Sequence, residues 1–387
     1  MRAANANLLV ALLGSGLLLA GCGGGKSVRQ PAVLETIDNR TVTIESAWRS
    51  SSGPDADDLD LGLTTVVTDD AVFTADAHGY VYALNRDSGK RIWRTDTDLR
   101  ISAGPTVEGD QVLIATRDAE VLALSRADGK ELWRSTVTSE VVAAPASNGK
   151  TVVVRSDDGR VTALSAEDGS QQWITGRTVP PLTLRGMAPP LIAGPVVVTG
   201  LETGRLIAQR LSDGETAWEA VVSVPSGRSE LERIADVDAR MLLASDTIFA
   251  LSYGGDVVAI NRFNGDERWR RSIRSYTGAA LSDDGSQLFV TAEDGAVWGL
   301  QTENGAAAWK TEALAWRRLS APAFHAGHVA VADYEGYVHY LSPRDGAIVG
   351  RSRPLGARVD ATPVVDGDRL YIGDVEGRLA ALGAKAE

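Results

Sequence analysis

Histidine and acidic side chains at short spacing are the residues of this chain whose types suit metal binding. His325 and His328 are separated by two residues, a spacing compatible with two ligands of one metal ion. Acidic residues followed by glycine, as at 157–159, could suggest calcium. No third ligand accompanies the histidines, and no Asp-x-Asp-x-Asp loop occurs. The pattern therefore favours structural histidines and ordinary turns, and we expect no metal, cofactor or catalytic residue.

The only cysteine, Cys22, ends a short apolar segment near the N-terminus. Arg2 precedes an apolar run over 8–20, which is too short to span a membrane and has the length of the apolar region of a secretory signal. The run ends in LAGC at 19–22, which resembles the lipobox of bacterial lipoproteins, in which the thiol receives a diacylglyceryl group. The alternatives for a lone secreted cysteine are a free thiol and an intermolecular disulfide. Gly23 in the second mature position, rather than aspartate, implies transport to the outer membrane.

Length and charge exclude some classes of function. The 387 residues are 44% hydrophobic, which is ample for a large core. Lys and Arg total 39 against 51 Asp and Glu, a formal net charge of -12 without a basic block, so binding to nucleic acid or to an anionic membrane surface by charge is disfavoured. Membrane attachment is therefore expected through lipid on Cys22, because each buried acyl CH₂ contributes roughly 0.8 kcal/mol.

A repeat organises the rest of the chain. Each unit opens with a glycine or alanine, continues with a small apolar pair and reaches a turn glycine, which in six of seven cases is followed four residues later by tryptophan. The units open at Gly79, Ala119, Gly159, Gly204, Gly255, Gly295, Gly336 and Gly377. The spacings of 40, 40, 45, 51, 40, 41 and 41 residues are typical of propeller blades.

Each unit contains four short apolar segments separated by turn residues, which predicts four antiparallel strands. Asp-Gly or Asn-Gly before the last strand supplies the positive φ of tight hairpins. The final unit, which starts at Gly377, stops before its last strand, and the orphan strand at 41–48 supplies it. The sequence therefore predicts an all-β, eight-bladed β-propeller of four-stranded antiparallel blades, closed by the N-terminal strand.

The repeated tryptophans are predicted to pack between neighbouring blades and not to form a ligand cage. There are six of them after turn glycines, and Gly350 occupies the tryptophan position of the seventh unit. Each indole ring buries about 150–250 Å², so the set contributes strongly to holding the ring together.

The blade signature resembles the tryptophan-docking repeat of pyrroloquinoline quinone (PQQ) dehydrogenases. That resemblance implies an enzyme in which the quinone lies over a disulfide of adjacent cysteines and is held by a calcium or lanthanide ion. Here the one cysteine is assigned to the anchor, and no Cys-x-x-Cys-His haem motif occurs. A PQQ-dependent periplasmic oxidoreductase or quinone-binding propeller is therefore the second hypothesis.

The two longest spacings indicate where function lies. The extra residues fall at 174–190 and 222–241, and both connections join the outer strand of one blade to the inner strand of the next, so they are expected on the same face as neighbours. In an extended first connection Leu182 and Leu184 point to one side, with Arg185 beside them. Exposed leucines and an arginine suit a protein partner. The alternative is that the leucines are buried under their own loop and that the aspartates of the second connection cap local backbone.

Taken together, the lipobox, the eight-bladed ring, Leu-Thr-Leu-Arg-Gly at 182–186 and Arg-Ile-Ala-Asp-Val-Asp at 233–238 resemble the BamB family, the propeller lipoproteins of the outer-membrane β-barrel assembly machinery. In that family the two loops bind a periplasmic POTRA domain of BamA, the central barrel subunit. The resemblance implies that the partner-binding residues are Leu182, Leu184, Arg185, Asp236 and Asp238.

The predicted organisation is a lipoprotein signal peptide at 1–21, a lipidated cysteine and flexible tether at 22–40, and the propeller at 41–384. The predicted function is a non-enzymatic scaffold on the periplasmic side of the outer membrane, which binds BamA and other assembly subunits and assists the insertion of outer-membrane proteins. Unfolded precursors of those proteins are candidate substrates.

Overall fold

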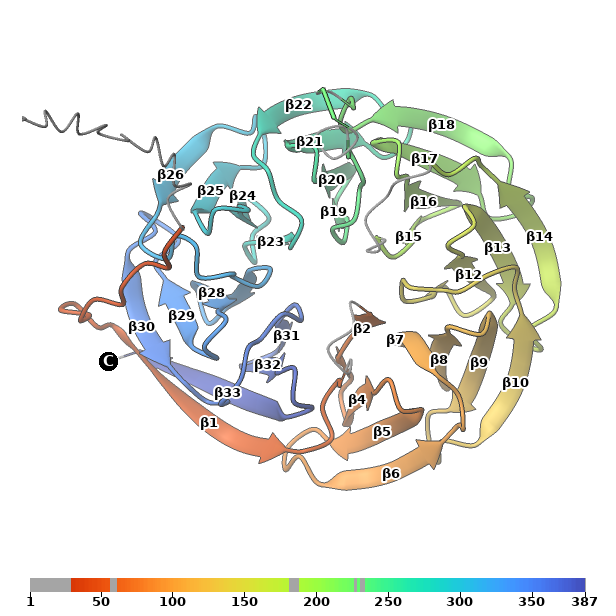
Figure 1. Ribbon diagram of the computed structural model, residues 1–387, viewed down its shortest axis with the longest axis horizontal. Coiled ribbons are helices and arrows are strands. Elements are labelled where there is room, and N and C mark those ends of the chain that lie inside the picture. Colours follow the sequence, from red (N-terminus) through yellow and green to blue (C-terminus); the bar gives the residue numbers. More distant parts are fainter. Residues whose placement is uncertain (1–28, 56–60, 181–187, 226–227, 230–233, 387) are drawn as a thin grey trace, which may run out of the picture. The chain divides into compact units, whose positions relative to one another are not determined.

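The computed structural model describes residues 29–55, 61–180, 188–225, 228–229 and 234–386, and Pro31–Glu387 form one compact unit. Cys22 lies outside the described residues. Eight sheets follow one another around a ring, and each contains four antiparallel strands arranged from the inner to the outer edge (Figure 1). The described residues are strands, turns and irregular backbone, and none of their segments is a helix long and apolar enough to cross a membrane. The prediction of an all-β, eight-bladed propeller is confirmed.

Blades are numbered along the chain, and their strands are given from the inner to the outer edge. Blade 1 comprises β3 (Val66–Val67), β4 (Ala71–Ala75), β5 (Tyr80–Asn85) and β6 (Arg91–Asp96), and blade 2 comprises β7 (Ile101–Glu108), β8 (Gln111–Thr116), β9 (Glu120–Ser125) and β10 (Glu131–Thr136). Blade 3 comprises β11 (Ala146–Ser147), β12 (Thr151–Arg155), β13 (Arg160–Ser165) and β14 (Gln171–Gly176), and blade 4 comprises β15 (Leu191–Ala193), β16 (Val196–Gly200), β17 (Arg205–Arg210) and β18 (Thr216–Val221). Blade 5 comprises β19 (Leu242–Ala244), β20 (Thr247–Leu251), β21 (Asp256–Asn261) and β22 (Glu267–Ser272), and blade 6 comprises β23 (Ala279–Leu281), β24 (Gln287–Thr291), β25 (Val297–Gln301) and β26 (Ala307–Thr311). Blade 7 comprises β27 (Ala323–His325), β28 (His328–Ala332), β29 (Val338–Leu341) and β30 (Ile348–Ser352), and blade 8 comprises β31 (Val364–Asp366), β32 (Arg369–Gly373), β33 (Leu379–Ala386) and β1 (Val42–Ser50).

The burial of the strands follows from face-to-face packing of the blades. Second and third strands such as β8 and β9 are apolar and buried on both faces, because each face meets a neighbouring blade. Outer strands such as β10 expose most residues and bury the tryptophan. The core is consequently a series of apolar layers between blades.

Each tryptophan of an outer strand lies over the turn glycine of the next blade. At the first of these contacts, a Cβ added to Gly89 would lie 2.4 Å from the Trp48 ring, and the glycine has a φ of 67°, so it is required both for the turn and for the approach of the indole. The indole Nε1–H also donates a hydrogen bond to a carbonyl of that blade, as from Trp48 to Arg86 at 2.8 Å. The same arrangement recurs for Trp93, Trp133, Trp173, Trp218, Trp269 and Trp309.

The ring closes by pairing of the two ends of the propeller. β1 pairs antiparallel with β33, from Val42 opposite Ala386 to Ser50 opposite Leu379. This confirms the predicted closure by the N-terminal strand. One feature was not predicted: β2 (Gly62–Leu63) adds a parallel fifth strand at the inner edge of blade 2, beside β7.

Candidate functional site

The two long connections leave the ring on either side of blade 4. The first joins β14 to β15 and the second joins β18 to β19. Leu182, Leu184 and Arg185 lie outside the described residues, whereas Asp236 and Asp238 lie within them. The described ends of both connections show how the ring holds them.

The ends of the two connections pack into one apolar cluster. Ala188, at the end of the first connection, is fully buried, and it shares this cluster with Val222 and Val237 from the second. The topological prediction that the two connections are neighbours is therefore confirmed at their described ends. The described ends of both connections are thereby packed into the apolar interior beside blade 4.

The start of the second connection is held by an arginine of the next blade. The Arg270 guanidinium donates a hydrogen bond to the carbonyl oxygen of Val221 at 2.8 Å and another to that of Val222. It also forms ion pairs with Asp256 at 2.9 Å and with Glu267 at 2.7 Å. Burial lowers the pKa of Arg270, but the hydrogen bonds with the two carboxylates outweigh it and the pKa is raised. A permanently charged clamp therefore joins blades 4 and 5 where this connection begins.

The end of the second connection is inserted between two hairpins. The Val237 amide donates to the Leu201 carbonyl oxygen of blade 4 at 3.3 Å, and the Tyr253 amide of blade 5 donates to the Asp236 carbonyl oxygen at 3.1 Å. The Ser252 hydroxyl donates to the Ala235 carbonyl oxygen at 2.7 Å. The segment is thus a rigid part of the ring.

Asp236 occupies a position that recurs around the ring. In other connections the corresponding carbonyl also accepts a hydrogen bond from the following hairpin; the residues are Asp55, Arg100, Glu140, Arg274, Arg317 and Arg358. Asp236 is only 1% exposed, and Asp238 is partly buried. For Asp236, burial favours a role in orienting neighbouring groups over direct contact with a partner. All of these residues are charged, as Asp236 is, but the hydrogen bond is accepted by the backbone carbonyl, so the residue type alone did not reveal the arrangement.

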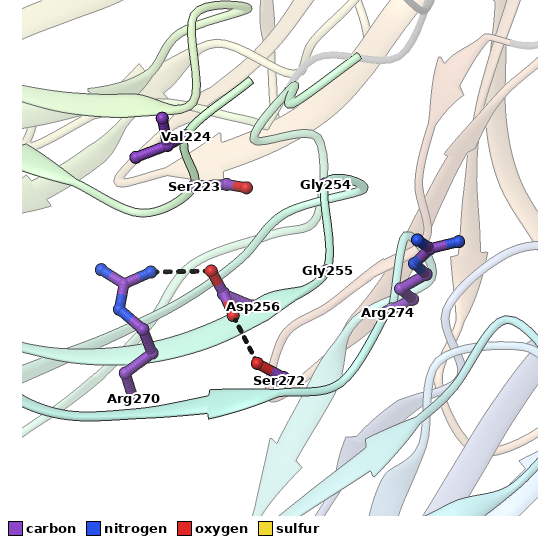
Figure 2. A pocket seen from close by; sticks show the side chains of 8 residues that line it. All are labelled: Ser223, Val224, Gly254, Gly255, Asp256, Arg270, Ser272 and Arg274. Carbon is purple, nitrogen blue, oxygen red and sulfur yellow. Dashed lines mark hydrogen bonds and ion pairs between the residues drawn. The ribbon is translucent and has the colours of Figure 1, made fainter. Parts of the chain in front are cut away.

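A cavity of about 680 Å³ opens beside the start of the second connection (Figure 2). In its wall, Asp256 is paired with Arg270 and accepts a hydrogen bond from the Ser272 hydroxyl at 3.1 Å, as Figure 2 shows. Val224 at the rim is 69% exposed, and the Arg274 side chain lines another side. Because the Asp256 carboxylate is paired with Arg270, the rest of the lining presents apolar, hydroxyl and cationic side chains.

The two histidines of the sequence motif make hydrogen bonds within blades 7 and 8. His325 is buried; its Nδ1 accepts a hydrogen bond from the Tyr340 hydroxyl at 2.6 Å, and its Nε2–H donates to the Asp368 carbonyl oxygen at 2.9 Å. Burial lowers the pKa of His325. The Nδ1 atom of His328 lies 2.7 Å from the Ala326 carbonyl oxygen, within hydrogen-bond distance. Within the described ranges, no group of three metal-binding side chains occurs.

A buried polar network in blade 7 was not anticipated from the sequence. Asp333 receives the Arg317 Nε–H at 2.7 Å and the His339 Nε2–H at 2.9 Å, and Arg351 donates to His339 Nδ1 at 3.1 Å. Burial lowers the pKa of His339, which keeps the imidazole neutral. Each of these atoms therefore has a hydrogen-bond partner within the network.

Comparison with known proteins shows which family this chain is similar to. Residues 77–311 match the family model described as outer membrane protein assembly factor BamB. A protein of that name from Alkalilimnicola ehrlichii is 47% identical over 382 residues, which is 99% of this chain and 98% of the relative. The Pseudomonas aeruginosa protein of the same name is 44% identical over 96% of this chain and 97% of its own length.

Solved structures share the fold at lower identity. The crystal structure of BamB from Moraxella catarrhalis has a TM-score of 0.79 at 23% identity and covers 88% of this chain and 100% of its own. The quinohemoprotein alcohol dehydrogenase from Comamonas testosteroni has a TM-score of 0.70 at 14% identity, covering 88% of this chain and 76% of its own. Both likenesses support the eight-bladed ring.

Proposed function

Because the chain belongs to the BamB family of outer membrane protein assembly factors, we propose that it is a lipoprotein scaffold of the machinery that folds and inserts outer-membrane β-barrels. The observation that carries this proposal is the near-complete, 47% identical match to a protein with that name. The chain acts at the outer membrane, on its periplasmic side, together with the BamA-type barrel subunit and other subunits of the complex.

We assign partner binding to the two long connections beside blade 4. Their described ends share one apolar cluster, and Arg270 holds the start of the second connection, so the loops are presented from a rigid base. Leu182 and Leu184 supply apolar anchors for a POTRA domain, and Arg185 supplies a charged contact. Asp236 orients this arginine from its buried position, and the partly buried Asp238 adds a carboxylate at the edge of the surface.

Lipidation of Cys22 anchors the scaffold. The apolar run and the lipobox support this assignment, and several acyl chains make such anchoring effectively permanent. The Cys22→Ser variant is expected to keep a folded propeller but to be released from the outer membrane, which membrane fractionation measures. Continued membrane retention would mean that the partner complex suffices to hold the protein.

The partner-binding assignment is tested by charge reversal of Arg185. Arg185→Glu is expected to lower co-purification with the barrel subunit at least about tenfold, corresponding to about 1.4 kcal/mol. Arg91→Glu is the matched control, since it makes the same charge change on an exposed outer strand of blade 1. Undiminished binding of a folded Arg185→Glu protein would remove the interface assignment.

The absence of enzymatic activity is part of the proposal. The relatives are named as assembly factors, while the dehydrogenase likeness is at 14% identity and extends only to the fold. Its test uses the chain from Lys26 onward, incubated with PQQ and calcium. We expect no bound-quinone absorption spectrum after gel filtration; a stoichiometric quinone spectrum would favour a quinone-binding propeller.

A further inference from the structure

The segment that precedes the propeller is attached to blades 6 and 7. We call residues 31–40 the N-terminal strap; in Figure 1 it is the red stretch of chain that lies beside β26 and β30. Its Ala32 amide donates to the Ala315 carbonyl oxygen at 2.8 Å. Directly after the strap, the Thr41 amide donates to the Val349 carbonyl oxygen of β30 at 3.1 Å. The strap is therefore fixed at both ends.

A buried arginine holds the beginning of the strap. Arg317 is 3% exposed, and its Nη1–H donates to the Ala32 carbonyl oxygen at 3.0 Å. The guanidinium also forms ion pairs with Asp333 and Glu335 and lies over the Tyr334 ring, 5.1 Å from its centroid. If the strap detached, this donor of a buried guanidinium would lose its acceptor, which is unfavourable in a site of low water access. The Arg317 guanidinium is thus a hydrogen-bond donor of the propeller whose acceptor lies in the strap.

Apolar packing and a second arginine hold the middle of the strap. Leu34 packs against the buried cluster of blades 6 and 7 that contains Phe289 and Leu314. The preceding Val33 points outward and is 87% exposed. The Arg351 Nη1–H donates to the Glu35 carbonyl oxygen at 3.0 Å. Alternation of buried and exposed side chains is the behaviour of an extended segment docked on one face.

We propose that the strap makes the edge of blades 6 and 7 the membrane-facing edge of the ring. The inference rests on the proposed lipidation of Cys22. Cys22 and Ala32 are separated by ten chain steps, which span at most about 33–36 Å when fully extended. If the first attachment were Val42, twenty steps would span about 66–72 Å. Docking of the strap therefore halves the maximum distance between the lipid and the ring.

The strap also separates the membrane attachment from the partner surface. In an eight-bladed ring blade 7 is opposite blade 3, whose outer strand β14 leads into the first long connection (Figure 1). The docked start of the strap is thereby held across the ring from the described beginning of the first long connection, at 177–180. Membrane anchoring and partner binding consequently use different edges and are compatible with each other.

The test compares two matched positions on opposite edges of the ring. Ala308 in β26 and Gln172 in β14 are both exposed and each directly precedes a seam tryptophan. Ala308→Cys or Gln172→Cys places a fluorescent donor on the lipidated protein, because Cys22 is the only other cysteine and is acylated. With the protein bound to phosphatidylcholine vesicles that contain an acceptor-labelled lipid, energy transfer is expected to be at least about twofold more efficient from position 308.

Variants of the strap provide the controls. Leu34→Asp is expected to abolish the difference between the two positions, whereas Val33→Asp, with the same change at an exposed neighbour, retains it. A twenty-residue Gly-Ser insertion after Lys26 is also expected to abolish it, since the longer tether relaxes the restriction on distance. Hydrogen exchange at the Ala32 amide reports strap docking directly, and an unchanged melting temperature of the Leu34→Asp protein shows that the ring is intact.

The possible results distinguish an error in the membrane-facing edge from an error in the proposed lipidation of Cys22. Vesicle-bound protein with equal transfer from both positions would overturn the membrane-facing edge and leave the proposed function standing. Failure of the protein to bind vesicles would overturn the lipidation of Cys22 and the membrane-facing edge with it. Rapid exchange at the Ala32 amide in the wild-type protein would overturn docking of the strap.

Discussion

The seam between blades 3 and 4 and the seam between blades 7 and 8 solve the same packing problem differently. At the first, the Trp173 ring lies over Gly214, and its Nε1–H donates to the Leu211 carbonyl oxygen at 2.8 Å. At the second, Gly350 replaces the tryptophan, and a Cβ added to it would lie 2.5 Å from the Val42 Cγ1 atom. The backbones of the two blades therefore approach directly.

The difference arises from the position of the chain termini. Each tryptophan docks on the hairpin between the third and fourth strands of the next blade, but in blade 8 these strands are β33 and β1, which belong to opposite ends of the propeller. No hairpin connects them, so an indole in blade 7 would have no turn to cover. The glycine at 350 is a consequence of ring closure and not a loss of the repeat.

Blade 7 compensates with polar contacts. Its interior contains the network of Asp333, His339, Arg317 and Arg351, and both arginines also bind the strap. The seam between blades 3 and 4 also contains a buried ion pair, between Arg155 and Glu202, beside its indole hydrogen bond. The blade 7 network differs from that ion pair in containing a buried histidine, His339, whose pKa is lowered by burial.

Truncation of a seam tryptophan has the largest expected effect on stability. Trp173→Ala removes a nearly buried indole and its hydrogen bond, and we expect the free energy of unfolding to fall by about 3–5 kcal/mol because a cavity remains. Ile174→Ala on the same strand is the control, since Ile174 is 38% exposed and should cost clearly less. Denaturant titration measures both, and equal losses would contradict the role of the seam.

The turn glycine of the same seam is tested by Gly214→Ala. Its φ is 76°, and a Cβ would lie 2.7 Å from the Trp173 Cε3 atom. Strain in the left-handed region and displacement of the indole together predict a loss of about 2–4 kcal/mol. As a control, Gly194→Ala has a similar φ of 73° with no neighbour within 4 Å, so it measures the backbone contribution alone. Similar losses in both variants would show that indole contact adds nothing.

The closing seam is tested by restoring the repeat. Gly350→Trp is expected to destabilise the propeller by about 1–3 kcal/mol, because the added side chain displaces Val42 from the seam. Limited proteolysis should then cleave earlier near β1 than in the wild type. A stabilised variant with an unchanged cleavage pattern would mean that the seam has room for an indole.

Acid is expected to weaken blade 7. Burial lowers the pKa values of His325 and His339 below their ordinary value near 6.5, and His339 faces Asp333, Arg317 and Arg351. As the pH falls, these histidines therefore bind protons in the unfolded chain at a higher pH than in the folded protein. The stability that they contribute is fully present above pH 6.5 and is lost as the pH falls below that value. The urea midpoint should decrease from pH 7 to pH 5, and His339→Gln should flatten this dependence. An unchanged slope in the variant would exclude His339 as its source.

The smallest expected effect is a gain in stability at the one repeat-opening position that is not glycine. Ala119 has a φ of 63°, whereas the other seven units have glycine with positive φ at that point. Ala119→Gly relieves left-handed strain of about 1–2 kcal/mol but increases the entropy of the unfolded chain by about 0.4–1 kcal/mol, so a net gain of up to about 1 kcal/mol is expected. Thermal unfolding measures it, and a lower melting temperature would show that the alanine methyl contributes packing.

The sequence predicted the blades because the chemistry that defines them is local. Asp-Gly turns, alternating apolar segments and tryptophans four residues after turn glycines recur at a fixed period, so each unit repeats the same information. The long connections were found for the same reason, as departures from that period. Their residues Leu182, Leu184 and Arg185 remain predictions, as does the lipidation of Cys22.

Other features depended on contacts between distant segments. The burial of Asp236, the network around Asp333 and the docking of the strap on Arg317 join residues that no short pattern connects; Arg317 and Ala32, for example, are 285 positions apart. The parallel addition of β2 is likewise a contact between segments and has no periodic signal. Such contacts are set by tertiary packing and not by a repeated local pattern.

By itself, then, the sequence determined the number of blades, their hairpins, the closing strand and the two places where the repeat is interrupted, because turn conformation and burial of alternate side chains are set by neighbouring residues. The tertiary structure decided which charges are buried, that Gly350 belongs to the closing seam, and that the N-terminal strap lies against blades 6 and 7. These outcomes depend on the desolvation and hydrogen bonding of groups that meet only in the folded ring.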